Sequence, residues 1–159
     1  MTTLEQALAE LHAARTELLA LLNGMDEATL ERPGALGAWS VKNVLAHLAA
    51  WEDWVVQALP VRMTTGTTPP EFRARVADED QFNALEVAER AELTPSEQLM
   101  ELERVRAELL RYVHTLPPAE LARRQPWPEW AGTLPEYLLV ALGQHERDHA
   151  AALRAALPR

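Results

Sequence analysis

Apolar side chains recur every three or four residues in four long segments of this chain. The segments cover residues 3–22, 40–59, 94–116 and 133–157. The third segment has the clearest stripe, formed by Leu99, Leu102, Val105, Leu109, Val113 and Leu116. A period of about 3.6 residues places such side chains on one face of an α-helix. The pattern predicts an all-α protein in which four helices form a bundle.

Residues typical of helix ends mark the boundaries of these segments. The N-cap residues are Ser40, Thr94 with Glu97 in a capping box, and Thr133 with Glu136 in a second capping box. Gly24 follows the first segment as a stop signal. The second helix is expected to end near Leu59, because Pro60 lacks the backbone N–H that a helix interior needs.

The connection between the second and third helices is about 35 residues long and includes a weaker helical stretch at 78–91. A link of this length can cross the bundle again, so these two helices can run parallel to each other. No second domain is visible. The whole chain, residues 1–159, is therefore expected to form a single domain with a short extra helix in this crossover.

Composition removes several classes of function. The chain contains no cysteine, so any metal must be held by imidazole, carboxylate or water, and any reactive thiol must come from a substrate. A net charge of −9 argues against a nucleic-acid partner, because phosphate binding relies on clustered Lys and Arg. The basic residues are scattered among acids, as on a solvated helix surface. No apolar run is long enough to cross a membrane and no signal peptide is evident, so the protein is expected in the cytoplasm.

Two histidines in the fourth segment lie on its apolar stripe. His145 and His149 are four residues apart, so their rings project side by side from one helix face. The stripe itself consists of Leu138, Ala141, Leu142, Ala152 and Ala156. A stripe of this kind offers few partners for two buried ring N–H groups. The spacing favours a pair of metal ligands over two core histidines.

The second segment supplies a third candidate ligand. His47 lies at the flank of the inward arc, beside Trp51, and stacking on that ring is the alternative role. Three protein ligands with an open position are typical of a catalytic metal site, whereas structural zinc sites are closed by four.

Other residues near this face are candidates for a substrate pocket. Glu52 lies on the other flank and could orient a ligand, act as a general base, or reach out to solvent. Trp39, Trp51 and Asn83 could wall a pocket at one end of the bundle, although covering the core is the more common role of such aromatics.

Three stretches together resemble the DinB-like four-helix-bundle superfamily, which includes bacterial thiol S-transferases and mycothiol-dependent maleylpyruvate isomerases. They are residues 39–48 with Trp51-Glu52, then residues 82–84, then residues 145–149. The resemblance implies an up-down-down-up bundle, often a homodimer. It also implies a divalent metal, zinc or nickel, whose ligands correspond to His47, His145 and His149.

The expected function follows from the open three-histidine set and the resemblance. The protein is expected to bind a small-molecule substrate and to transfer a low-molecular-weight thiol onto an electrophile, with the metal lowering the pKa of the thiol. The alternatives are a metal-dependent hydrolase or detoxification factor, and a non-catalytic bundle that binds a ligand or dimerises.

Overall fold

The computed structural model describes residues 1–158 and is all-α, with no β-strand in that part of the chain. Its long helices are α1 (Leu4–Leu22), α3 (Val41–Thr65) and α6 (Pro95–Val113), and a fourth long helix is built from α8 (Leu134–Leu138), η1 (Leu139–Gln144) and α9 (His145–Ala156). The short helices are α2 (Glu27–Glu31), α4 (Pro70–Arg75), α5 (Glu79–Glu89) and α7 (Pro118–Ala122). The predicted fold class is confirmed.

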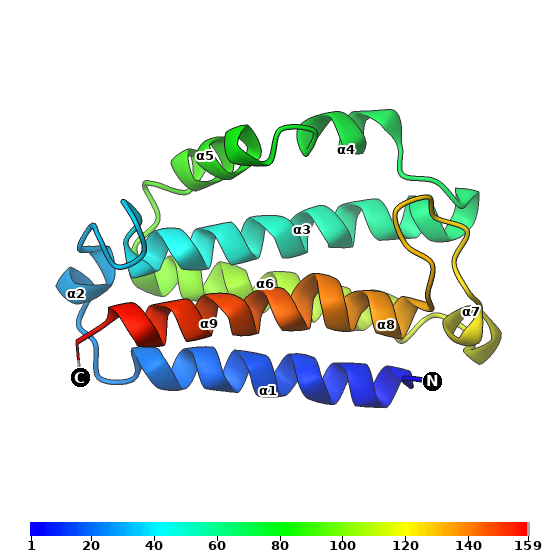
Figure 1. Cartoon of the computed structure of the whole chain (residues 1–159), viewed down its shortest axis with the longest axis horizontal. Helices are drawn as coiled ribbons and strands as arrows, with labels where there is room; N and C mark the ends of the chain where they lie inside the picture. Colours follow the sequence, from blue (N-terminus) through cyan, green and yellow to red (C-terminus); the bar gives the residue numbers. More distant parts are fainter. Residues whose placement is uncertain (159) are drawn as a thin grey trace.

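The four long helices run up-down-down-up (Figure 1). α1 and the α8–α9 helix run in one direction, and α3 and α6 run in the other. The parallel helices are also neighbours, because α3 packs against α6 and α1 packs against α9. The long link between α3 and α6 makes this parallel pairing possible, as expected.

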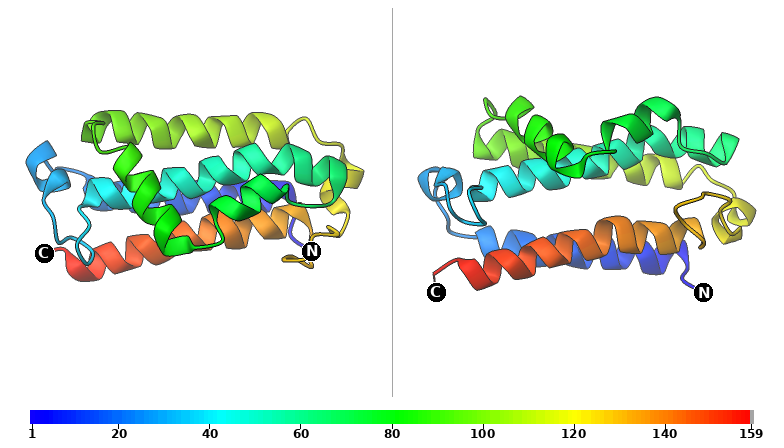
Figure 2. Two further views of the ribbon diagram at one scale, coloured as in Figure 1. Left: turned by 90° about the horizontal axis from the view of Figure 1, so that it is seen from above. Right: turned by 45° about the horizontal axis from the view of Figure 1, so that its top comes forward.

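That link carries α4 and α5 and lies outside the bundle, over α3 and toward α9 (Figure 2). α5 packs on α3 through Phe82, which is buried against Trp51. The crossover therefore covers the face of the bundle between α3 and α9.

The predicted caps are present. The hydroxyl of Ser40 accepts a hydrogen bond from the backbone N–H of Asn43, and Thr94 and Thr133 form capping boxes with Glu97 and Glu136. Each such cap contributes about 1 kcal/mol to helix stability. These helix starts depend on hydrogen bonds between residues three apart, so adjacent positions in the sequence predict them.

The prediction that the second helix ends before Pro60 is wrong. α3 continues through Pro60 to Thr65 and ends at Gly66, whose φ of 76° gives a left-handed C-cap. Arg62 accounts for the extra turns, because its buried guanidinium stacks 3.9 Å from the Trp127 ring centroid. It also donates to the Tyr137 hydroxyl at 2.9 Å. These contacts offset the backbone hydrogen bond that proline removes.

Buried apolar side chains form two clusters, one at each end of the bundle. Between them lies a layer of four ionised side chains, one from each long helix: Arg15, Glu52, Arg106 and Glu146. The expectation that the basic residues are scattered as on a solvated helix surface is wrong for Arg15, Arg62 and Arg106, which are buried. No helix in residues 1–158 is long and apolar enough to span a bilayer.

Candidate metal centre

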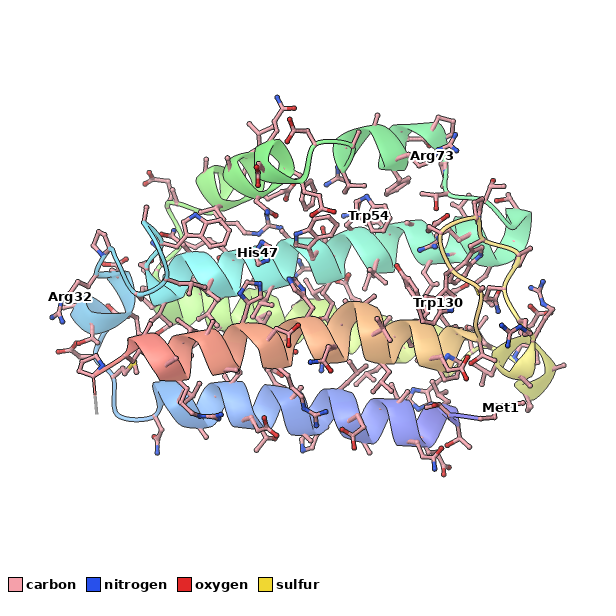
Figure 3. All side chains as sticks on the ribbon, viewed as in Figure 1. Met1, Arg32, His47, Trp54, Arg73 and Trp130 are labelled. Carbon is pink, nitrogen blue, oxygen red and sulfur yellow. The ribbon has the colours of Figure 1, made fainter. Side chains whose placement is uncertain are left out.

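The imidazole rings of His47 on α3 and of His145 and His149 on α9 converge on one point. Figure 3 labels His47 on α3. The Nε2 atom of His47 lies 3.0 Å from Nε2 of His145 and 3.0 Å from Nε2 of His149. The remaining Nε2–Nε2 separation, between His145 and His149, is 3.1 Å. Three histidine side chains from two helices thus direct their Nε2 atoms at a common centre.

These distances suit a single metal ion. Imidazole nitrogens bind zinc at about 2.0–2.1 Å, so nitrogens that are 3.0–3.1 Å apart can all contact one ion. Three imidazole nitrogens facing one another cannot all satisfy their hydrogen-bonding capacity among themselves, because a lone pair needs a donor or a cation. A divalent cation at the centre satisfies all three.

The electrostatics of the site keep the histidines in the form that binds metals. Burial, reinforced by the neighbouring imidazoles, lowers the pKa of His47 to about 3. Burial and then His149 lower the pKa of His145 to about 4, and burial lowers the pKa of His149. The neutral imidazole is the ligand form, so these rings need not lose a proton to bind a metal at pH 7.

The fourth long helix reaches this geometry through an irregular turn. Residues 139–144 form a π-helical segment directly before His145, and such segments often occur at functional sites. The wider turn changes the register, so that Glu146, Ala150 and Leu153 face the core after it. His145 and His149 are half-buried and face a cavity instead.

The inward stripe that the sequence predicted for this helix is therefore wrong in its second half. Ala152 is half-buried and Ala156 is exposed, whereas Ala150 and Leu153 are fully buried. The prediction assumed a constant 3.6-residue turn, and the π segment interrupts that period before the histidines.

The three histidines lie in the wall of a cavity of about 510 Å³ between α3, α5 and the α8–α9 helix. Trp39, Trp51 and Asn83, proposed from the sequence as pocket residues, also line it. The Trp51 indole N–H donates to Asn83 Oδ1 at 2.8 Å, and the Trp39 ring centroid lies 5.1 Å from that of His47. The other lining residues are Trp54, Val55, Glu79, Tyr137 and Ala141.

Sequence reasoning missed Glu79 and Tyr137. Glu79 precedes Asn83 by four residues, so both side chains lie on one face of α5, and this spacing was the available signal. No sequence pattern indicates that Tyr137 lines the cavity, because its place there depends on how α8 packs relative to α3.

Glu52 does not line this cavity. Its side chain is 3% exposed, so the alternative in which it reaches out to solvent is wrong. One carboxylate oxygen accepts from Nε of Arg106, and the other accepts from Arg15 at 3.2 Å and from Arg106 at 3.2 Å. A role for Glu52 as base or orienter stays a prediction.

Comparison with known proteins places this fold in a wider group. A family model described as the DinB superfamily matches residues 10–153. The crystal structure of an uncharacterised protein from Escherichia coli UTI89 is similar, with a TM-score of 0.79 and 17% identity over 98% of this chain and 93% of that one. No curated protein matches the chain.

Two further crystal structures are similar over nearly their full length. The colibactin self-resistance protein ClbS, solved in complex with a dsDNA, has a TM-score of 0.78 and 14% identity over 98% of this chain and 96% of ClbS. The four-helix bundle protein TT2238 has a TM-score of 0.61 and 31% identity over 98% of this chain and all (100%) of TT2238. At identities of 14–17% the likeness concerns the fold alone. The family match covers most of the sequence, and this chain belongs to the DinB superfamily.

Proposed function

We propose that this protein is a metal-dependent enzyme that transfers a low-molecular-weight thiol to an electrophilic small molecule. The observation that carries the proposal is the convergence of three imidazole Nε2 atoms, 3.0–3.1 Å apart, in the wall of a cavity. Three histidines can hold a divalent ion, zinc or nickel, and leave a position for a substrate atom.

The chain contains no cysteine, so a reacting thiol has to enter with the substrate. A divalent ion bound here supplies the positive charge that lowers the pKa of a thiol. The residues of the chain provide the rest of the site. His47, His145 and His149 would act as neutral ligands, and the rings of Trp39 and Trp51 line the space beside them.

A small molecule suits this cavity better than a nucleic acid does. The cavity volume is in the usual range for small-molecule sites, and no Lys or Arg is among the residues that line it. The net charge of −9 also opposes binding to a phosphate backbone. The dsDNA in the ClbS crystal is a property of that protein, which shares 14% of its residues with this one.

Hydrolysis is the second candidate function. It is favoured by the same feature, because three histidine ligands leave a position on the metal that water can occupy. A water molecule in place of a thiol becomes a nucleophile when a metal lowers its pKa. The two reactions differ only in the atom that occupies the open position, so they are separated by substrate.

The test begins with the metal. The protein is incubated with zinc or nickel, passed through a desalting column and analysed for metal content. We expect about one ion per chain, and we expect His47→Ala, His145→Ala and His149→Ala each to abolish retention. His12→Ala is the matched control, because His12 is exposed on α1 and is expected to leave retention unchanged.

The loaded protein is then assayed for conjugation of small thiols to a chromogenic electrophile, and separately for hydrolysis of chromogenic esters. Thiol conjugation that depends on His149 supports the proposal, and ester hydrolysis with the same dependence supports the second candidate. A folded wild-type protein that retains no metal contradicts both and leaves a non-catalytic ligand-binding bundle.

A further inference from the structure

The cavity beside the three histidines has an unusual charge distribution. Its walls are mainly aromatic and aliphatic, contributed by Trp39, Trp51, Trp54, Val55 and Ala141. Among the lining residues, Glu79 is the only acid and there is no Lys or Arg. Histidines that bind a metal are neutral, so Glu79 supplies the only charge among the residues that line this cavity. Asp148, outside the lining, is a second acid near the site, because its charge raises the pKa of His145 and of His149 against the lowering by burial.

The carboxylate of Glu79 is available to a ligand. Glu79 is the first residue of α5 and is exposed, and it forms no ion pair with any residue of the described chain. By contrast, Glu86 on the same helix is paired with Arg75 at 3.2 Å and with Arg90 at 2.6 Å. The chain therefore leaves uncompensated the one acid that borders the cavity.

The position of Glu79 is set by its helix. Asp78 caps α5 by accepting a hydrogen bond from the N–H of Gln81 at 3.0 Å. Asn83 lies one helical turn after Glu79, and its Oδ1 accepts a hydrogen bond from the Trp51 indole N–H. The face of α5 that carries Glu79 and Asn83 is therefore turned toward the cavity that the histidines line. Figure 2 shows this helix crossing over α3 toward α9.

Charge balance then selects the substrate. A divalent ion, one bound thiolate and the Glu79 carboxylate sum to zero charge. A second anionic group on the substrate would add an uncompensated negative charge between aromatic walls and near a carboxylate, which is unfavourable. An ammonium group at the far end of the substrate would instead be attracted by Glu79 and by the faces of the tryptophan rings.

We propose that the cavity selects thiols that are uncharged or cationic apart from the thiol itself, and that Glu79 is the specificity-determining residue. This inference rests on the proposed function, because it concerns the thiol that occupies the open metal position. It excludes thiols that carry carboxylates as preferred substrates.

The test uses three thiols of equal length with different charge at the end remote from sulfur: 6-aminohexane-1-thiol, 6-mercaptohexan-1-ol and 6-mercaptohexanoate. The six-carbon chain keeps the terminal group from chelating the metal. The protein is loaded with cobalt(II), and binding is followed by the thiolate-to-cobalt charge-transfer absorption. We expect the amine and the alcohol to bind more tightly than the carboxylate, with the amine favoured over the carboxylate by about fivefold or more.

Variants identify the residue responsible. Glu79→Gln is expected to reduce the difference between the amine and the carboxylate to less than about twofold, and Glu79→Lys is expected to reverse it. Asp80→Asn is the matched control, because Asp80 is the next residue, is exposed and does not line the cavity, so it is expected to keep the wild-type preference. Cobalt content measured on each variant reports whether the histidine site is intact.

Two failures are distinguishable. Equal binding of the three thiols by wild-type protein, or an unchanged preference in Glu79→Gln, overturns the inference about selectivity and leaves the proposed function in place. Protein that retains cobalt but gives no charge-transfer absorption with any of the thiols overturns the proposed thiol chemistry and this inference with it.

Discussion

His47 has one ring nitrogen directed at the histidine centre and one directed away from it. A histidine that binds a metal through Nε2 carries its proton on Nδ1, and that proton needs an acceptor. Nδ1 of His47 is buried and has no hydrogen-bond partner among residues 1–158. Although burial dominates the lowered pKa of His47, the Asn83 side chain lies close enough to oppose that effect. Asn83 Oδ1 accepts from Trp51 and keeps a second lone pair, so we expect it to become the acceptor of this proton when His47 binds a metal.

Asn83 is therefore expected to orient His47. Asn83→Ala should weaken zinc affinity by about 10- to 100-fold, the usual effect of removing a residue that supports a metal ligand. The measurement is a competition titration against a chromogenic chelator. Gln81→Ala, at an exposed position of the same helix, is the control and should leave the affinity unchanged. An Asn83→Ala protein with wild-type zinc affinity would contradict this role.

At the scale of elements, two of the long helices contain a feature that is unusual inside a regular α-helix. α3 accommodates Pro60 and continues to Thr65, and the fourth long helix contains a π segment at residues 139–144. The extension of α3 depends on Arg62, which is 1% exposed and packs against both the Trp127 and the Tyr137 ring. Its guanidinium also donates to Glu129 at 2.6 Å and so ties the loop before α8 to the end of α3.

Arg62→Ala should destabilise the protein by about 2–4 kcal/mol, because it leaves a cavity beside the Trp127 and Tyr137 rings and removes buried hydrogen bonds. The free energy of unfolding is measured by urea titration, followed by tryptophan fluorescence. Arg73→Ala is the matched control, since Arg73 is exposed on α4 and its loss should cost less than about 0.5 kcal/mol. Equal stability of the two variants would show that the last turns of α3 do not depend on Arg62.

At the scale of the whole molecule, the layer of Arg15, Glu52, Arg106 and Glu146 joins the four long helices at mid-height. Each arginine contacts both glutamates, and the two positive and two negative charges balance. The layer occupies the same stretch of α9 as the histidines, because Glu146 lies between His145 and His149 in sequence. A buried ion network contributes little net stability compared with apolar packing, but a single unpaired charge within it is costly.

Glu52→Gln should therefore destabilise the protein by about 3–5 kcal/mol, because it leaves the buried guanidinium of Arg106 without its main counter-charge. Glu103→Gln is the matched control. Glu103 also pairs with Arg15, at 3.0 Å, but its side chain is 58% exposed, so the expected loss is at most about 1 kcal/mol.

The same variant tests whether Glu52 acts as a base. If its role is structural, Glu52→Gln should keep the turnover number of the folded fraction and lose stability only. A variant of wild-type stability whose turnover number falls would contradict the structural role and support the catalytic one.

Local features of the chain determined a large part of this structure. Helix starts at Ser40, Thr94 and Thr133 depend on hydrogen bonds between residues three apart, so they can be read from adjacent positions. The side-by-side placement of His145 and His149 follows from their spacing of four on one helix. The approach of His47 was inferred from its place near an apolar face, and the packing of α3 beside α9 brings its ring to the other two.

The tertiary structure alone decided what depends on partners distant in sequence. Arg62 keeps α3 helical past Pro60 because it packs against Trp127 and Tyr137, which lie far from it in sequence. Glu52 can be buried because α1 and α6 each place an arginine against it. The π segment likewise changes which face of the last helix meets the core. Helical periodicity and capping arise from neighbours within about four residues, whereas the burial of a charge or the register after a π-helical turn is set by the sum of contacts across the bundle.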